Sequence, residues 1–362
     1  MIEAQMWHPV ALAEALPTGG DAAPLAVDLL EQPLVLWRDS AGQPQAFTDR
    51  CPHRGARLSL GRVCAGQLAC PYHGWRFEPG GQLAQIPALP GFVPPAGHRA
   101  TAHPVLERHG LLWVLLQPPA DGPLPALPAF AAEADERLRK LNCGPYEVAA
   151  SAPRIVENFL DMAHFGFVHE GWLGDRGHTQ IPDYRIDATP TGFIASGCTA
   201  WQPQSSVHAQ GGAMVEYTYE VNAPYTAVLT KVPQPAPETP AASPPQGGAG
   251  RLGSGPASAR PHTVQIDGFR EAIALFICPI TPERSRVWFR LAMNDFESPD
   301  ATLQAFQHTI FTQDQPVLES QRPQRLPISD SAPVQELHCA ADRSASAYRR
   351  HLRALGIRFG TC

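Results

Sequence analysis

Cys51-Pro52-His53-Arg54-Gly55 and Cys70-Pro71-Tyr72-His73-Gly74-Trp75 are two short stretches of similar design in the first quarter of the chain. Each stretch offers one thiol and one imidazole, and its Pro and Gly residues are typical of a tight loop. Two thiolates suit one iron of a [2Fe–2S] cluster, and two imidazoles suit the other. A Cys2His2 zinc site is the alternative, but zinc ligands usually come as CxxC and HxxxH pairs. The mixed loops therefore predict an iron–sulfur cluster on Cys51, His53, Cys70 and His73.

A second motif places Asn158, Asp161, His164 and His169 within one short segment. Apolar residues recur at helical spacing around it, so we expect a helix over 153–169. Asp161 and His164 lie three residues apart and share a helix face. His169 is five residues beyond His164 and needs a local break, which Gly166 can supply. Two imidazoles and one carboxylate bind Fe(II) and leave positions open for dioxygen and substrate.

The bulk composition excludes several classes of protein. The 362 residues carry a net charge of −6 and their Lys and Arg residues are not clustered, so we expect no nucleic-acid partner. The first residues do not resemble a signal peptide, and no apolar run is long enough to span a membrane. Eight cysteines are too few for a disulfide scaffold, which favours a cytoplasmic setting. No GxGxxG stretch follows a strand, so a nicotinamide or flavin must come from another protein.

The apolar patterns predict an α+β chain of two domains. An all-β domain is expected over 1–130, ending in a proline-rich linker at 118–130, and a second domain over 131–362. The second domain should hold an antiparallel sheet with helices, interrupted by a Pro/Gly/Ser-rich, disordered insertion at 233–261. The expected strands are 34–38, 45–47, 111–116, 215–221, 227–232, 272–276 and 287–291, and the expected later helices are 300–322 and 343–355.

The two Cys/His loops resemble the Rieske domain of non-heme iron oxygenases. The segment 158–169 resembles the catalytic helix of Rieske oxygenase alpha subunits, in the group of vanillate and dicamba demethylases and saxitoxin-pathway hydroxylases. The stretches 169–176 and 347–357 are similar to the same group. Respiratory-type Rieske proteins have an extra Cys in each loop, where this chain has Ala56 and Tyr72. The resemblance implies an N-terminal Rieske domain and a helix-grip-like catalytic domain, and it argues against a high-potential electron carrier.

The resemblance also implies roles for individual residues. In that group the carboxylate ligand of the mononuclear iron comes from a late helix, which points to Asp314, with Glu319 as the competitor. Asp161 is then not a ligand but accepts hydrogen bonds from His164 and from a cluster histidine of a neighbouring subunit. A carboxylate behind an imidazole fixes its orientation. Asn158 matches a residue close to the iron.

The expected function is that of an oxygenase component. It would use O2, and electrons from NAD(P)H delivered by a separate flavin reductase with or without a ferredoxin, to hydroxylate or oxidatively demethylate a small aromatic or alicyclic substrate. The group implies a head-to-tail homotrimer, and a reductase docking face near Arg54 and Arg57. The alternatives are a Rieske-type electron-transfer protein and a zinc-stabilised binding module. The predicted substrate pocket is mostly apolar, with the candidate lining residues Phe165, Phe167, Tyr217, Phe276, Met293 and Asn294.

Overall fold

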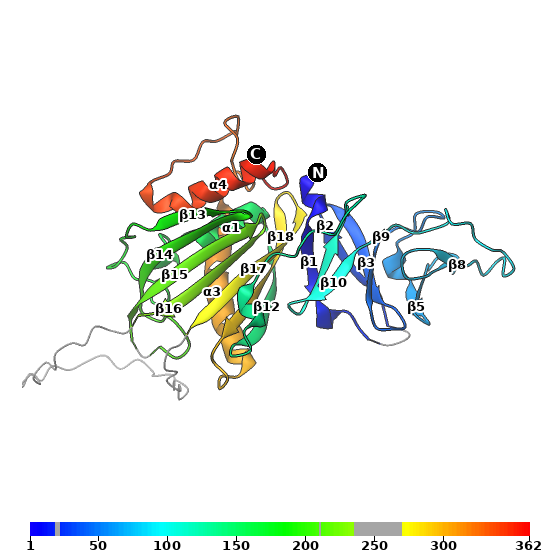
Figure 1. Cartoon of the computed structure of the whole chain (residues 1–362), viewed down its shortest axis with the longest axis horizontal. Coiled ribbons are helices and arrows are strands. Elements are labelled where there is room, and N and C mark those ends of the chain that lie inside the picture. The colour runs from blue at the N-terminus through cyan, green and yellow to red at the C-terminus, as the bar shows by residue number, and fades with distance from the viewer. Residues whose placement is uncertain (19–21, 210, 235–269) are drawn as a thin grey trace, which may run out of the picture.

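The computed structural model describes residues 1–18, 22–209, 211–234 and 270–362. Within these ranges, four antiparallel sheets follow one another along the long axis of the molecule, with the seven-stranded sheet at one end and the four-stranded sheet of residues 62–85 at the other (Figure 1). The described ranges also contain short 3-10 helices: η1 (Ile2–Gln5), η2 (Ala13–Ala15), η3 (Leu58–Leu60), η4 (Ala131–Ala134) and η5 (Ala340–Asp342). No helix in the described ranges is long and apolar enough to cross a membrane.

Two sheets form the body of the N-terminal part. The first has the order β1-β11-β10, with β1 (Trp7–Leu12), β11 (Leu111–Leu115) and β10 (Val105–Arg108). The second has the order β2-β3-β4-β9, with β2 (Leu25–Leu29), β3 (Gln32–Arg38), β4 (Pro44–Thr48) and β9 (Ala102–His103). The predicted strands 34–38 and 45–47 are confirmed, and they form a hairpin in which Leu36 of β3 pairs with Ala46 of β4. Residues 118–130 form no helix or strand.

A third, small sheet supports the two Cys/His loops. Its order is β5-β6-β7-β8, with β5 (Arg62–Cys64), β6 (Gln67–Ala69), β7 (Arg76–Phe77) and β8 (Leu83–Gln85). One loop enters this sheet before β5 and the other joins β6 to β7. Cys51 and Cys70 pack in one core cluster with Trp37 and Phe47 of the neighbouring sheet. The loops therefore stand on a rigid, buried base.

The seven-stranded sheet is the core of the C-terminal part, in the order β12-β18-β17-β16-β15-β14-β13. The alternation predicted over 215–221 is confirmed, because all four apolar residues of that stretch are buried. The predicted insertion begins too early, since Pro233 is the last residue of β16; 235–261 lies outside the described residues. The strands are β12 (Arg139–Val148), β13 (Arg185–Thr189), β14 (Gly192–Gln202), β15 (Ala213–Ala223), β16 (Thr226–Pro233), β17 (Glu271–Thr281) and β18 (Arg284–Met293).

The two faces of this sheet have different partners. One face carries α1 (Ala152–Leu160), α2 (Phe165–Val168), α3 (Asp300–Ser320) and α4 (Arg343–Leu355), and the main core lies between them. The other face packs on β1 and β11, so that Ala274, Phe276 and Cys278 share a core with Trp113. The predicted helices 300–322 and 343–355 are confirmed to within two residues at their ends.

Candidate functional site

The two Cys/His loops have matching backbone geometry. In each loop a glycine amide donates to the cysteine carbonyl, from Gly55 to Cys51 at 2.9 Å and from Gly74 to Cys70 at 3.1 Å. Both glycines have left-handed φ angles, +74° for Gly55 and +71° for Gly74, which residues with a side chain rarely adopt. The shared turn explains why Gly stands at the same place in both motifs.

The loops bury their thiols and expose their imidazoles. Cys51 and Cys70 are 1% and 3% exposed, whereas His53 and His73 lie at the surface with their ring centroids 4.6 Å apart. Trp75 stacks on His53, with the ring centroids 4.4 Å apart, so it covers one side of the loop pair. Burial raises the pKa of the Cys51 thiol to about 11. A thiolate at this depth therefore needs nearby positive charge, which suits these loops to a metal cluster.

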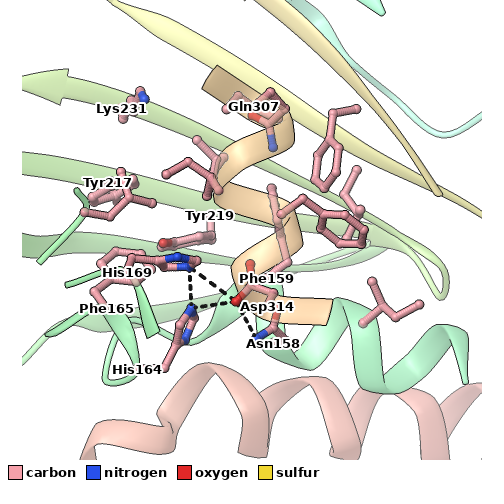
Figure 2. Close-up of a pocket in the computed structure, with 18 of the residues that line it drawn as sticks. Asn158, Phe159, His164, Phe165, His169, Tyr217, Tyr219, Lys231, Gln307 and Asp314 are labelled. Carbon is pink, nitrogen blue, oxygen red and sulfur yellow. Dashed lines mark hydrogen bonds and ion pairs between the residues drawn. The ribbon is translucent and has the colours of Figure 1, made fainter. Parts of the chain in front are cut away.

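His164, His169 and Asp314 converge on one point (Figure 2). The Nε2 atoms of the two histidines lie 3.2 Å apart, and Asp314 Oδ1 lies 3.4 Å from His164 Nε2 and 3.2 Å from His169 Nε2. Donor atoms bound to one ion at about 2.1 Å and at right angles to each other would lie about 3 Å apart. The three side chains therefore fit one face of an octahedral metal ion.

Each histidine is oriented by a second polar group. His164 Nδ1 donates to Asp161 Oδ2 at 2.9 Å, and His169 Nδ1 donates to Gln313 Oε1 at 2.8 Å. Burial alone would raise the pKa of Asp161, but the bonds from His164 outweigh it and lower that pKa. Because both acceptors are oxygens, each ring must present a bare Nε2 to the convergence point. Sequence reasoning missed Gln313, whose only signal is its place beside Asp314.

The chain reaches this geometry by a break at Asp161, not at Gly166 as predicted. Helix α1 ends at Leu160, and Asp161 has the extended ψ of 136° before the short helix α2 begins. Gly166 lies inside α2, where an added Cβ would meet the carbonyl oxygen of Asp175 at 2.8 Å. A Cβ at Gly174 would meet the Gly166 amide at 2.6 Å. Both glycines therefore allow the 170–178 loop to cross close over α2.

The structure places Asp314 and Glu319, the two candidate carboxylates, in different surroundings. Asn158 Nδ2 donates to Asp314 Oδ1 at 3.3 Å, so Asn158 and Asp314 lie at the convergence point. Glu319 instead accepts from the amide of Ala149 at 3.1 Å and from Gln315 Nε2 at 2.8 Å. Its carboxylate is thus engaged with β12 and its own helix, away from the histidines.

A mostly apolar cavity opens on the three converging side chains. Its floor is the helix-covered face of the large sheet and its roof includes α3 (Figure 2). Polar groups are few: Lys231 and Gln307 lie at the end away from His164 and His169 (Figure 2). The apolar lining comprises Ile155, Phe159, Phe165, Leu173, Leu229, Ile273, Leu275, Phe289, Phe306, Ile310 and Phe311, with Tyr217 and Tyr219 beside them.

Of the six lining residues predicted, Phe165 and Tyr217 line this cavity. The prediction for Phe276 was wrong, because this side chain lies on the other face of β17 and packs against Trp113. Phe167 is 54% exposed, and Met293 lines a smaller adjoining cavity. Asn294 follows β18 and accepts a hydrogen bond from the backbone amide of Arg270.

Two family models match the chain. The model of the Rieske [2Fe-2S] domain matches residues 6–99, and that of the vanillate O-demethylase oxygenase C-terminal domain matches residues 148–357, more than half of the chain. The chain belongs to the Rieske-type oxygenases. This oxygenase therefore carries a Rieske [2Fe–2S] cluster and a mononuclear iron, and takes its electrons from a separate reductase, as the resemblance implied.

The relatives include demethylases. Methylxanthine N1-demethylase NdmA of Pseudomonas putida is 30% identical over 351 residues, covering 96% of this oxygenase and 88% of the relative. The solved structure of NdmA with caffeine has a TM-score of 0.74 at 27% identity, covering 97% and 90% of the two chains. Dicamba monooxygenase bound to dicamba has the same fold, with a TM-score of 0.74, 23% identity and 97% of each chain covered.

A shorter match involves a relative named as an oxidoreductase. Oxidoreductase NdmD of Pseudomonas putida is 39% identical over 122 residues, which is 33% of this oxygenase and 20% of NdmD. A match of 122 residues is too short to span residues 148–357, which this oxygenase has and which match their own family model. The comparisons therefore support the oxygenase and favour neither the electron carrier nor the zinc module.

Proposed function

We propose that this oxygenase oxidatively removes an N-methyl group from a small aromatic or alicyclic compound. The observation that carries the proposal is the cavity: the three converging side chains face a mostly apolar space, which suits a small ring system with few polar groups. The choice of an N-methyl group is supported by relatives named as methylxanthine N1-, N7- and N3-demethylases.

In this proposal His164, His169 and Asp314 hold the mononuclear iron, and the four loop residues Cys51, His53, Cys70 and His73 hold the cluster. Glu319 is not a ligand, because its carboxylate has other partners. Iron bound at the three side chains supplies the reduction of dioxygen. Asp161 and Gln313 keep the imidazoles oriented, and Asn158 holds the Asp314 carboxylate.

The proposed reaction balances with two electrons. One oxygen atom of O2 replaces a methyl C–H bond with C–OH, and the other leaves as water after taking up two electrons and two protons. The resulting N–CH2OH group then breaks at its C–N bond, which releases formaldehyde and leaves N–H on the ring. The apolar cavity wall positions the ring and limits the access of water.

The same proposal includes a closed ring of three copies. The small sheet that supports the Cys/His loops and the strands β15 and β16, which line the cavity, lie towards opposite ends of one chain, with the other N-terminal sheets between them (Figure 1). His53 and His73 lie at the surface, and the side chain of Asp161 is 30% exposed beside His164. A head-to-tail interface would bring these groups of two copies together, and such an interface closes into a ring.

Two further expectations stay predictions. The domain boundary at residue 130 falls within the stretch between the two family matches. A cytoplasmic setting is consistent with eight cysteines that are all free thiols in the described ranges. Neither expectation affects the site.

Replacing His164 with Ala tests the proposal. The purified parent should hold about three irons and two acid-labile sulfides per chain. The His164→Ala variant should hold about two irons, keep both sulfides and the cluster absorption, and form no formaldehyde with a surrogate reductase. His338→Ala, at an exposed histidine, is the matched control. An active His164→Ala variant, or one that retained the third iron, would refute the assignment.

A further inference from the structure

The cavity has one polar end, and it lies across three adjacent strands. Tyr217 of β15, Lys231 of β16 and Glu271 of β17 are paired in register, so their side chains form a row on the cavity face of the sheet. The next row, Tyr219, Leu229 and Ile273, carries no charge.

Lys231 and Glu271 form a buried ion pair. Lys231 Nζ lies 2.6 Å from Glu271 Oε2, and the two side chains are only 6% and 9% exposed. The ammonium also donates to the carbonyl oxygen of Ser205 at 3.0 Å. An ammonium has three N–H donors, so these two partners leave one N–H for the cavity that Lys231 lines.

Gln307 faces this polar end from helix α3. Its side chain is buried, with 9% of the residue exposed, and lines the same cavity (Figure 2). Within the described ranges, no hydrogen-bond partner is found for its amide. Its amide atoms are not among the fully buried atoms without a partner, so they are accessible from the cavity and can bind a ligand there. Gln307 precedes Asp314 by seven residues, which is about 10 Å along the helix axis.

The charge balance restricts what can bind here. Lys231 is the only Lys or Arg among the described residues that line the cavity, and Glu271 already neutralises it. A carboxylate entering this end would approach Glu271 and share a single cation, at low dielectric. A neutral carbonyl oxygen needs only the spare N–H of Lys231 and the amide of Gln307.

We propose that Lys231, Glu271 and Gln307 select substrates that carry a neutral carbonyl group, such as a lactam or amide, over substrates that carry a carboxylate. The carbonyl binds beside Gln307, which lies about 10 Å from Asp314 along the axis of α3. The methyl group to be oxidised lies near His164 and His169. Glu271 is the selective element, because it cancels the charge that would otherwise attract an acid. This inference rests on the proposed function, in which the cavity is the substrate site.

Two probes of the same shape, each with one N-methyl group, test the selection: 4-(methylamino)benzamide and 4-(methylamino)benzoate. Dissociation constants are measured by anaerobic titration calorimetry on iron-loaded protein without reductase, so that binding is scored apart from turnover. The parent should bind the amide at least about 10-fold more tightly than the acid. A parent that bound the acid equally well or better, or that bound neither probe, would overturn the proposal.

Two variants test whether Glu271 and Lys231 cause the preference for the amide. Glu271→Gln keeps the shape but leaves Lys231 unpaired, so the preference should shift toward the acid by about 10-fold or more. Lys231→Met/Glu271→Met keeps the cavity neutral, and should weaken amide binding without improving acid binding. This double variant guards against misfolding, because apolar replacement of a whole buried pair is often tolerated. An unchanged preference in a folded Glu271→Gln variant would refute the role of Glu271.

Gln304→Leu is the matched control. Gln304 lies on the same helix, but its amide donates to the carbonyl oxygen of Asn142 on the exposed side. Its replacement should leave both dissociation constants unchanged, whereas Gln307→Leu should weaken amide binding. If the preference holds but no methyl group is lost when reductase and O2 are added, the proposed demethylation fails and the binding assignment stands.

Discussion

Gln313 orients His169, one of the histidines of the proposed iron site. It is the residue before Asp314, yet its amide oxygen turns to His169 Nδ1 at 2.8 Å while the Asp314 carboxylate turns to the same ring's Nε2. Consecutive helix residues point about 100° apart, so the two side chains reach His169 from different sides. The result is a single allowed tautomer for His169, with Nε2 bare.

Replacing Gln313 with Leu should weaken Fe(II) binding by about 10- to 100-fold, because the ring loses the group that fixes its orientation. The measurement is Fe(II) titration of the iron-depleted site in protein with an intact cluster, read with a competing chelator. The cluster absorption should not change. Thr312→Val is the matched control, because the Thr312 hydroxyl bonds only to carbonyl oxygens of its own helix. Equal Fe(II) affinity in Gln313→Leu and the parent would contradict this role.

Helix α1 is held in place by charges as well as by its apolar face. Arg349 of α4 donates to Glu157 of α1 through Nε at 2.6 Å and Nη2 at 2.8 Å. Glu336 bridges Arg349 and Arg154, which is only 3% exposed. Burial alone would raise the pKa of Glu336, but both arginines outweigh it and lower that pKa. Because Asn158 follows Glu157, this network also positions the metal end of α1.

Replacing Arg349 with Met should lower the free energy of unfolding by about 3 kcal/mol, because it leaves the Glu157 carboxylate without its main partner in a mostly buried place. Denaturant titration followed by circular dichroism measures the change. Arg350→Met, at the exposed neighbouring position, should cost little. The double variant Arg349→Met/Glu157→Met should recover much of the loss. A loss below about 1 kcal/mol in Arg349→Met would show that the network is not stabilising.

Across the whole molecule, Glu133 links three parts of the chain. It lies in η4 and accepts from Arg290 of β18 at 2.7 and 2.9 Å, while His109, near the end of β10, lies 3.5 Å away. Burial alone would raise the pKa of Glu133, but His109 and Arg290 outweigh it and lower the pKa from 4.5 to about 2. Arg290 makes the stronger contact, because it binds both carboxylate oxygens at shorter distances.

A folded-state pKa below the unfolded value means that this carboxylate stabilises the protein above about pH 4.5 and loses that effect as the pH falls toward 2. Allowing for its partial exposure, Glu133→Gln should cost about 2 kcal/mol at pH 7. Unfolding of variant and parent is compared from pH 7 downward. The difference should be constant above pH 5 and shrink below it. A difference that grew as the pH fell would contradict the assignment.

The proposed ring predicts complementation between two inactive variants. In the proposed site, His53→Ala removes a cluster ligand and His164→Ala removes an iron ligand, so each variant alone should form no product. In randomly mixed rings about a quarter of the head-to-tail interfaces would join an intact cluster to an intact iron site. Co-expressed chains should therefore regain about a quarter of the parent activity. Separately purified variants, mixed without subunit exchange, are the control; inactive rings of verified mixed composition would exclude electron transfer between copies.

Much of this site was predictable from the sequence, because metal ligation needs particular atoms at particular spacings. The two Cys/His loops and the segment from Asn158 to His169 indicate both metal centres by residue type and spacing alone. The antiparallel sheet and the late helices followed from hydrophobic periodicity. Asp314 depended on resemblance, since nothing local distinguishes it from Glu319.

Only the tertiary structure decided which side chains meet at the cavity. Strand β17 is buried on both faces, so its residues show no alternation from which a face could be assigned. Packing of the N-terminal sheets on one face sends Phe276 away from the cavity and leaves Glu271 and Ile273 toward it. The positions of Gln313, Lys231 and Gln307 likewise depend on contacts between distant segments. The residue types that bind a metal lie within short stretches and can be recognised from the sequence. Which residues of a strand buried on both faces point toward the cavity depends on the segments that pack against each face.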